Sequence, residues 1–444
     1  MLDKQRCQEI FADLLKFSDA DETELLIGGG GSALTRFANN TIHQNVAEEG
    51  YSLSVRTSYG QRTARATTNK FDSESLRRVV AESSLLARQQ QPDPELLPMP
   101  GPQSYPPVDR YFENTAAVGP NQRAGVVAAA IRVAEKDGLT AAGTYSTGAG
   151  MHALLNSRGL MAYYRGTQAE FSITTMGSSS TGWAKKTAPD AREISGQALA
   201  ERATSIATSS RAPKEIAPGS YVTILTPAAV LDLVGFMFFD FSGQAVRDQR
   251  SFLTDRIGTK LFGANINISD DVYHALQFGP PFDGEGMCRR ALPLVERGVI
   301  KNLAYARATA KAMGTEPTGH GFPLPNEIGE FPTNIVFAGG NSSVDEMIAS
   351  TARGILVTRL WYIREVDPYK KILTGMTRDG TFLVENGKIA GGIRNFRFNE
   401  SLIEMLNSVE MLGAPERASG EESFPMVVPS LKVSSFHFSE VTKF

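Results

Sequence analysis

The side chains best suited to metal chemistry are few in this chain and widely spaced. A hydrolytic zinc site takes about three protein ligands, and two histidines on one helix must lie within about one turn to share an ion. None of the five histidines precedes a glutamate, and no two lie within two helical turns of each other; they are His43, His152, His274, His320 and His437. The residues alone therefore predict no histidine-based zinc motif.

Two carboxylates and one of the two cysteines share a short glycine-rich segment, FDGEGMC, from Phe282 to Cys288. Asp283 and Glu285 could bind calcium or an amine. Carboxylates between glycines are more typical of a tight acidic turn, which is the interpretation that we favour. Cys288 would need an adjacent base to act as a nucleophile, and no histidine stands near it in the sequence.

The run Gly28–Gly31 invites comparison with a phosphate-binding loop. No Gly-Lys-Ser/Thr follows it, and the spacing of the dinucleotide fingerprint is not met. We therefore predict a flexible turn between two strands, because glycine tolerates unusual backbone dihedrals.

The composition is that of an ordinary globular protein of 444 residues, with 41% hydrophobic and 21% charged residues. A net charge of −3 gives no basic stripe for nucleic acid. Two cysteines do not indicate a disulfide framework. The N-terminus lacks the apolar core of a secretory signal, and no window reaches the roughly 18 apolar residues of a membrane span, so we expect a cytoplasmic protein with neither membrane nor nucleic-acid partners.

The first half of the chain predicts helices and short antiparallel strands in a repeated order. Helices are expected at residues 2–18, 72–89, 121–136 and 192–208, and strands at 23–27, 33–37, 41–46, 51–57, 62–67, 141–147, 152–156, 161–167, 170–176 and 183–186. Turns are expected at Asn39-Asn40 and Glu49-Gly50, and Asp72 or Ser73 should cap the second helix. An offset of about 120 residues relates YSLSV at Tyr51 to FSITT at Phe171. We infer a duplicated helix–hairpin–helix unit, about residues 20–90 and 140–208.

Proline-rich segments predict how the chain is divided. Residues 91–110 contain seven prolines and predict an extended connector. Residues 212–219 offer the best boundary between an N-terminal α+β domain, 1–211, and a C-terminal domain, 212–444.

The C-terminal domain is predicted to be mostly antiparallel β, curved or barrel-like. Hairpin turns are expected at Arg297-Gly298, Arg378-Asp379-Gly380 and Asn386-Gly387, and a last strand at 426–438. Short helices are expected at 343–350 and 401–410. A longer helix, 228–250, should begin after Thr226-Pro227, because proline is favoured in a first helical turn.

Nearly the whole chain resembles the TldD/PmbA family of metallopeptidases. The resemblance is strongest in RFANNTIHQ at 36–44, in FDGEGMCRRALPLVERGVIKNLAYARATAKAMG at 282–314, and in LVTRLWYIREVDP at 356–368 with LTGMTRDGTFLVENGKI at 373–389. In the catalytic branch of that family, the long helix carries a His-Glu-x-x-x-His motif. The matching positions here begin at Phe239 and Asp240 and end at Gln244.

The resemblance therefore implies the PmbA branch, also called TldE, which lacks the metal motif. A phenyl ring and a carboxamide replace the two imidazoles, and neither is a competent zinc ligand. The family's cysteine near the C-terminus is also missing, since residues 413–428 contain none. The resemblance implies a non-catalytic subunit with no cofactor of its own, working with a TldD-type partner that holds zinc and processes peptides and unfolded proteins.

Several alternatives stay open at this stage. The partner could be a second copy of the chain, and a stand-alone homodimeric peptide-binding or scaffold protein is the competing hypothesis; a hydrolase with an unrecognised site is weaker. Asp240 could contact peptide, but we favour a residue that faces solvent or pairs with Arg247 or Arg250. Phe236, Phe238, Phe239 and Phe241 should pack in a core or interface.

The loop GTEPTGHG, 314–321, resembles a family loop beside the active-site cleft. A substrate cleft formed by Asp283, Glu285, Thr318 and His320 follows from that likeness.

Overall fold

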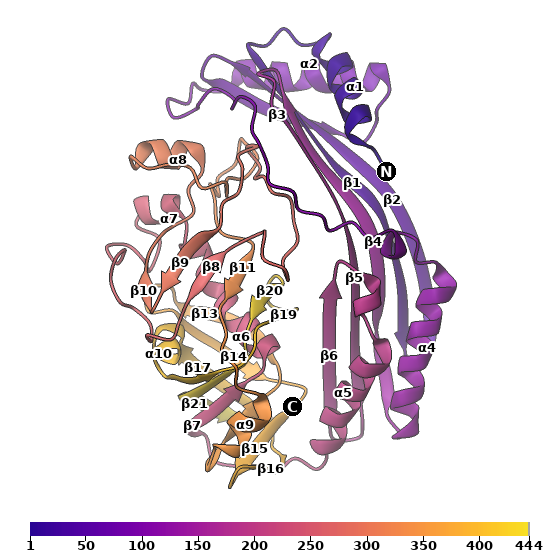
Figure 1. Ribbon diagram of the computed structural model, residues 1–444, viewed down its shortest axis with the longest axis vertical. Helices are drawn as coiled ribbons and strands as arrows, with labels where there is room; N and C mark the ends of the chain where they lie inside the picture. The colour runs from indigo at the N-terminus through magenta and orange to yellow at the C-terminus, as the bar shows by residue number, and fades with distance from the viewer. Residues whose placement is uncertain (443–444) are drawn as a thin grey trace.

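The computed structural model describes residues 1–442. Its first half is built on a six-stranded antiparallel sheet of order β3-β2-β1-β4-β5-β6. The strands are β1 (Glu22–Ala38), β2 (Thr41–Tyr59), β3 (Arg62–Thr68), β4 (Thr140–Asn156), β5 (Met161–Met176) and β6 (Thr181–Ala188). Figure 1 shows the four central strands running along most of the height of the molecule.

The central strands are continuous where the sequence predicted breaks. The turns expected at Gly28–Gly31 and at Glu49-Gly50 are wrong, and so are the gaps between strands at 147–152 and 167–170. Gly30 pairs with Gly50 on one side and with Gly150 on the other, so its backbone groups belong to two strand ladders. Pairing on both sides outweighs the turn preference of these glycines.

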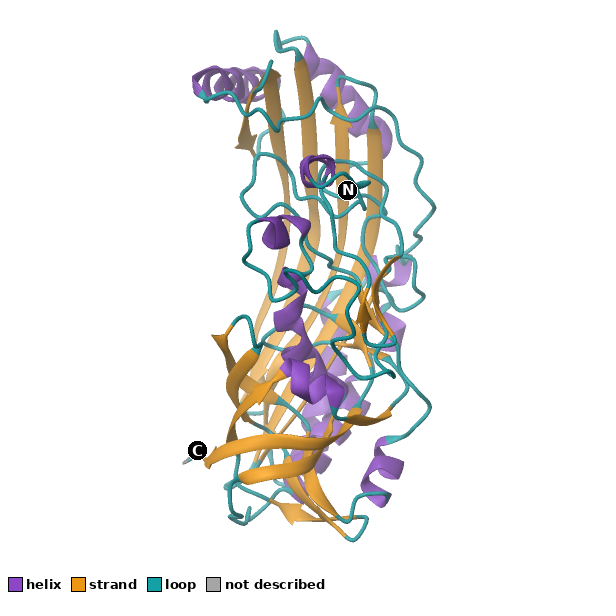
Figure 2. Ribbon diagram, turned by 90° about the vertical axis from the view of Figure 1, so that its left-hand side faces the viewer, coloured by secondary structure: helices purple, strands orange, loops and turns teal. Residues whose placement is uncertain are grey.

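Helices cover one face of this sheet, as Figures 1 and 2 show. At one end α1 (Lys4–Leu15) and α2 (Ser73–Gln89) pack on Leu25, Leu53 and their neighbours. At the other end α4 (Pro120–Lys136) and α5 (Gly196–Ser209) pack on a core around Phe171. Strand residues in both cores are mainly odd-numbered, so even-numbered residues face the other way.

The chain repeats one order of elements, first as α1-β1-β2-β3-α2 and then as α4-β4-β5-β6-α5. The helix α3 (Glu113–Ala116) separates the two units, and η1 (Ala191–Glu193) precedes α5. Residues 91–109 contain no helix or strand, as expected of a connector. The connector is nevertheless anchored, because the Asn156 amide donates to Pro100 O at 2.8 Å and the Tyr105 hydroxyl donates to Gly286 O at 2.7 Å.

The C-terminal half, residues 219–442, forms two further sheets around the largest apolar core. A nine-stranded, mostly antiparallel sheet has the order β13-β14-β17-β21-β7-β12-β15-β16, with β18 paired to β21. Its strands are β7 (Gly219–Leu225), β12 (Arg353–Val357), β13 (Leu360–Asp367), β14 (Ile372–Thr377), β15 (Thr381–Glu385), β16 (Lys388–Gly392), β17 (Phe396–Ser401), β18 (Val409–Leu412) and β21 (Leu431–Val441).

A smaller sheet has the order β10-β9-β8-β11-β20-β19. Its strands are β8 (Ile268–Asp270), β9 (Leu292–Glu296), β10 (Val299–Ile300), β11 (Ile335–Phe337), β19 (Glu416–Ala418) and β20 (Met426–Val428). Short helices α8 (Arg307–Ala312), α9 (Val344–Ala349) and α10 (Leu402–Asn407) lie between strands. The predicted α+β class with a curled, barrel-like C-terminal sheet is confirmed.

Two strand predictions in this half need correction. Arg378-Asp379-Gly380 does not close a hairpin, because β14 pairs with β13 and β17 while β15 pairs with β12 and β16. The Asn386-Gly387 hairpin does form, between β15 and β16. The predicted last strand is split into β20 and β21, which belong to different sheets.

The long helix expected at 228–250 is also wrong. The segment forms α6 (Pro227–Val234), a 3-10 helix η2 (Gly235–Asp240) and α7 (Gly243–Arg247). The Ser242 hydroxyl accepts from Ala245 N at 3.1 Å and so caps a new helix. Gly243 N donates to Ala304 O and Ala304 N donates to Phe241 O, at 2.9 and 2.8 Å, so this backbone pairs with another segment instead of continuing the helix.

Among residues 1–442, no helix is both long enough and apolar enough to cross a membrane.

Candidate functional site

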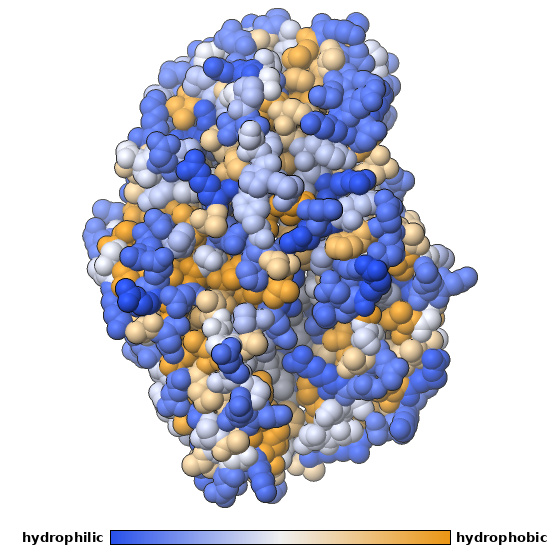
Figure 3. Space-filling model, in the orientation of Figure 1, coloured by the Kyte–Doolittle hydropathy of each residue, from blue (hydrophilic) through white to orange (hydrophobic). Residues whose placement is uncertain are grey.

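A cleft separates the helix-free face of the first sheet from loops of the C-terminal half. It consists of two adjoining cavities of about 870 and 680 Å³, which share Gly29, Gly50, His152 and Pro280. Strands β1, β2, β4 and β5 form one wall, and loops 278–289 and 320–323 form the other. Figure 3 shows one face of the molecule, where apolar residues gather at mid-height on the side of the C-terminal half.

A row of glycines crosses the sheet wall of the cleft. Gly50, Gly30, Gly150 and Gly166 pair in direct register from β2 to β5. All four are even-numbered and line the 680 Å³ cavity. The phenol of Tyr164 covers Gly166, but a β-carbon at Gly50 would meet no heavy atom within 4 Å. From Gly50 to Gly150 the row itself is therefore bare backbone that a flat or extended ligand can approach closely.

The loop wall is held in place by buried carboxylates. Asp283 accepts from Glu285 N and Met287 N at 2.9 Å each, and from Gly321 N at 2.8 Å. Glu285 accepts from Arg307 N at 3.0 Å, at the start of α8. Burial raises the pKa of Asp283, and burial together with Asp283 raises the pKa of Glu285 to about 7. The contacts of Asp283 with Glu285 N and Met287 N form a tight acidic turn, which is the interpretation of FDGEGMC that the sequence favoured.

His320 belongs to a row of buried polar groups in the same loop wall, between Asp270 and Thr318. Its Nε2 is 3.0 Å from Asp270 Oδ1, and its Nδ1 is 2.9 Å from the Thr318 hydroxyl. Burial favours a raised pKa for Asp270, but His320 and Arg289 hold that pKa below its usual value. The Thr318 hydroxyl also accepts from Tyr305 N at 2.8 Å, so it holds the loop together and is not a free nucleophile.

The four predicted cleft residues are thus brought together, but in two layers. Asp283 and His320 line the 870 Å³ cavity, and Glu285 and Thr318 lie behind them. The Cys288 thiol donates to Arg289 O at 3.4 Å and lies 3.7 Å from the Tyr273 hydroxyl.

The degenerate motif positions Phe239, Asp240 and Gln244 point in different directions. Phe239 is 57% exposed, and its ring centroid lies 4.4 Å from that of Phe331. Phe331 in turn lies 4.9 Å from Phe322, which lines the cleft. Phe238 and Phe241 are buried in the main core, as expected for this aromatic cluster, and Phe236 packs against it.

Asp240 does not face solvent or pair with Arg247 or Arg250, as the sequence suggested. It is 7% exposed, and its Oδ2 lies 2.5 Å from Lys371 Nζ, while Arg247 and Arg250 both pair with Asp248. The break after η2 turns the carboxylate into the core. Burial raises the pKa of Asp240, and Lys371 acts against that rise.

Gln244 contacts Glu330 through its backbone N–H and not through its carboxamide. Its N–H donates to Glu330 Oε1 at 2.8 Å, and the same oxygen accepts from the Ser242 hydroxyl at 3.0 Å. The other oxygen of Glu330 accepts from Ala306 N at 3.2 Å and the Thr309 hydroxyl at 3.0 Å. Glu330 therefore ties α7 to α8, and burial raises its pKa.

These residues do not fit a zinc ion. Zinc needs thiolate, imidazole or carboxylate donors converging within about 2.3 Å of one point. Phe239 and Gln244 supply none, and the carboxylate of Asp240 already contacts an ammonium. Within residues 1–442, no group of three or more His, Cys, Asp or Glu side chains is placed to hold a metal ion.

The sequence analysis missed Lys371, Asp270, Glu330 and the glycine row. The first three lie far along the chain from their partners, and no local pattern marks them. The glycine row did leave a signal, because Gly28 and Gly30 recur as Gly148 and Gly150 at the same offset of about 120 residues that suggested the duplication.

Comparison with known protein families finds two matching domain models. Residues 218–440 match the PmbA/TldA metallopeptidase C-terminal domain, and residues 24–87 match PmbA/TldA metallopeptidase domain 1.

Individual relatives agree with these matches. The crystal structure of TldE from Thermococcus kodakarensis superposes with a TM-score of 0.89 at 20% identity, over 98% of this chain and 99% of that one. Metalloprotease PmbA from Escherichia coli O157:H7 is 21% identical over 86% of this chain and 85% of its own length. An uncharacterized protein from Methanocaldococcus jannaschii is 28% identical over 48% of this chain. The chain spans about half the length, or less, of the first curated relatives that it matches, with 51%, 37% and 46% covered.

Proposed function

The chain belongs to the PmbA/TldD metallopeptidase family, and we propose that it is the non-catalytic, TldE-like subunit of a TldD-type zinc metallopeptidase. In this proposal a partner chain supplies the metal and the hydrolytic step, and the complex acts on peptides and unfolded proteins. The chain described here supplies a peptide-binding wall.

The arrangement at Phe239, Asp240 and Gln244 carries the proposal. An active member needs donors at these positions that converge on one ion. Here Phe239 lies outside the core and Asp240 is paired with Lys371. The backbone N–H of Gln244 is bound by Glu330. Restoring a site would require more than two substitutions, because the helix itself is broken between η2 and α7.

The cleft suits an extended peptide better than a compact ligand. Its sheet wall offers backbone along the row from Gly50 to Gly166, and its loop wall offers Phe282 and Phe322. A peptide in extended conformation can lie flat where side chains are absent, and aromatic rings provide contact area that does not depend on sequence. A folded domain would not fit cavities of about 870 and 680 Å³.

Zinc therefore belongs to the proposed partner and not to this chain. When bound there, the ion would polarise the scissile carbonyl and lower the pKa of a bound water. The residues of this chain would orient the peptide and keep it extended.

The proposal is tested first by affinity isolation of the tagged chain from its native lysate, with identification of the bound proteins by mass spectrometry. A stoichiometric paralogue that carries His-Glu-x-x-x-His supports the heteromeric peptidase. Recovery of the chain with itself alone contradicts it and favours the stand-alone, homodimeric peptide-binding protein.

A further inference from the structure

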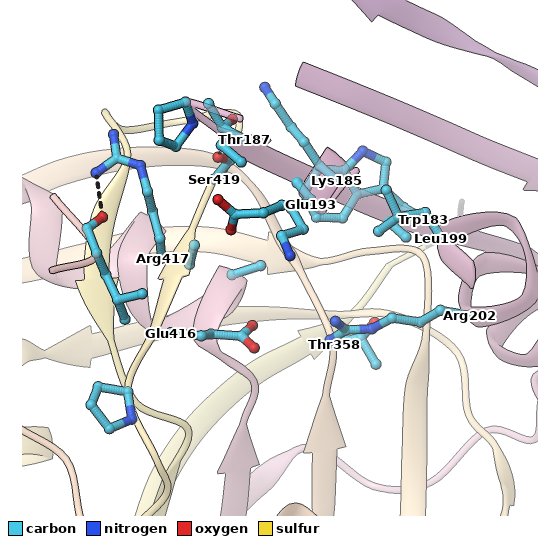
Figure 4. Close-up of a pocket in the computed structure, with 18 of the residues that line it drawn as sticks. Trp183, Lys185, Thr187, Glu193, Leu199, Arg202, Thr358, Glu416, Arg417 and Ser419 are labelled. Carbon is cyan, nitrogen blue, oxygen red and sulfur yellow. Dashed lines mark hydrogen bonds between the residues drawn. The ribbon is translucent and has the colours of Figure 1, made fainter. Parts of the chain in front are cut away.

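A second, smaller pocket lies beside the cleft, where the first sheet meets the C-terminal half, and its Arg417 stacks on Phe278 of the 680 Å³ cavity at 3.9 Å from the ring centroid. Its volume is about 330 Å³. Edge strand β6 and helix α5 form one side, and edge strand β19 with Thr358 forms the other (Figure 4). A hydrogen bond of 2.6 Å between the hydroxyls of Thr187 and Ser419 joins the two sides. The volume is at the small end of the range for ligand sites, which begins at roughly 300 Å³.

The floor of the pocket is apolar. The indole of Trp183 is 7% exposed, Leu199 9% and Ala418 5%. Cations beside the floor already have partners: Lys185 pairs with Glu170 at 3.3 Å and with Glu421 at 3.5 Å. Arg417 donates to Gln277 Oε1 at 2.5 Å. Lys185 is thus compensated by carboxylates, whereas Arg417 meets a neutral amide and, among residues 1–442, has no carboxylate within 4.0 Å.

The rim carries four further charges that the protein leaves uncompensated. Lys186 and Arg202 are cationic, and Glu193 and Glu416 are anionic. Within residues 1–442, none of these four side chains has an oppositely charged group within 4.0 Å or makes a side-chain hydrogen bond. Figure 4 shows Arg202 and Glu416 extending from opposite sides toward the space between them.

We propose that this pocket binds a small zwitterion with an apolar side chain, such as a free amino acid or a dipeptide. Its carboxylate would meet the Arg202 side of the rim and its ammonium the Glu416 side, since charge-assisted hydrogen bonds are the stronger ones. Its apolar side chain would cover Trp183 and Leu199. A simple anion would be attracted by Arg202 but repelled by Glu193 and Glu416. A simple cation would be attracted by Glu416 but repelled by Lys186 and Arg202.

The proposal stands on the pocket alone and does not depend on the chain being a peptidase subunit. A ligand bound here would contact α5 and β19 together, and so would strengthen the junction between the first sheet and the C-terminal half. It should therefore raise the unfolding temperature of the full chain progressively as its concentration exceeds its dissociation constant.

The test is calorimetric titration of the purified full chain with leucine, leucyl-leucine, N-acetyl-leucine and leucinamide. N-acetyl-leucine lacks the ammonium group and leucinamide lacks the carboxylate. Each should bind at least about tenfold more weakly than leucine or leucyl-leucine, because one charge-assisted contact is lost. Arg202→Gln and Glu416→Gln should each weaken leucyl-leucine binding by a similar factor.

Matched controls are Arg132→Gln and Glu135→Gln, on the exposed side of α4 and outside the pocket. They should leave binding unchanged, and thermal unfolding checks that all four variants fold. N-acetyl-leucine binding as tightly as leucine would show an anion site and overturn the proposal. So would the absence of binding by leucine and leucyl-leucine at concentrations up to about 10 mM.

Discussion

The segment after β7 and the loops of the cleft wall both bury carboxylates, but the two regions use them differently. In the first region, Asp240 pairs with the ammonium of Lys371, which also pairs with Glu365 at 2.6 Å, so the carboxylate is held inside an ion-pair cluster. In the second region, Asp283 accepts three backbone N–H groups, and the result is a fixed loop surface facing the cleft. A buried acid therefore identifies neither a metal site nor a catalytic base until its partners are known.

The largest effect should come from breaking the pair in the first region. Lys371→Met leaves the buried Asp240 without its cation and should lower the free energy of unfolding by about 3–5 kcal/mol. Urea denaturation measures the change. Lys370→Met is the matched control, because Lys370 is the exposed neighbour and should change stability by no more than about 0.5 kcal/mol. Equal effects for the two variants would show that the Asp240 pair does not stabilise this core.

The cleft wall should respond next most strongly. Asp283→Ala leaves three backbone N–H groups without an acceptor and should cost about 3 kcal/mol. Hydrogen exchange should show lost protection at Glu285, Met287 and Gly321, while α6 stays protected. Glu327→Ala, at an exposed position in a neighbouring loop, serves as the control. If protection falls evenly over the whole chain, the wall is not a separately held surface.

The pH dependence distinguishes the two regions further. Glu285 has a pKa of about 7 in the folded protein, against an ordinary value of 4.5. Because the folded pKa is the higher one, this group contributes stability that is present below pH 4.5 and is lost as pH rises through 7. Glu285→Gln should remove about 2 kcal/mol of the difference in unfolding free energy between pH 5 and pH 8. If the unfolding free energy of the variant changes between pH 5 and pH 8 as much as that of the parent, other groups cause the pH dependence.

The smallest change in the free energy of unfolding is expected for a substitution in the glycine row. Gly50→Leu places a side chain in the cleft where a β-carbon meets no atom within 4 Å, so stability should change by less than about 1 kcal/mol. Binding of a fluorescein-labelled unstructured peptide, followed by fluorescence anisotropy, should weaken at least about tenfold. Gly125→Leu on α4 has the same open surroundings outside the cleft and should bind as the parent does. Equal binding by both variants would place the peptide elsewhere.

Local patterns predicted the elements of this fold better than their connections. Asp72 caps α2 and Asn386-Gly387 closes a hairpin, because these preferences act over a few residues. The turns expected at Gly28–Gly31 and Glu49-Gly50 failed because cross-strand pairing, which the local sequence does not show, keeps the glycines in long strands.

The candidate site was predictable only in part, for a similar reason. Asp283 was singled out as a carboxylate between glycines, and His320 by the resemblance of its loop to a family loop. Asp270, the partner of His320, and Lys371, the partner of Asp240, are set by tertiary contacts across 50 and 131 residues. Arg247 and Arg250 were nearer in sequence to Asp240, but the helix break turned that carboxylate away from them.

The most direct test of the central claim compares the purified chain alone with its reconstituted mixture with the His-Glu-x-x-x-His paralogue. Zinc content is measured by mass spectrometry, and cleavage is followed on an unstructured fluorogenic peptide. We expect the chain alone to hold no stoichiometric zinc and to cleave nothing, and the mixture to cleave until the paralogue's motif is substituted. One zinc per chain together with cleavage by the chain alone would contradict the account.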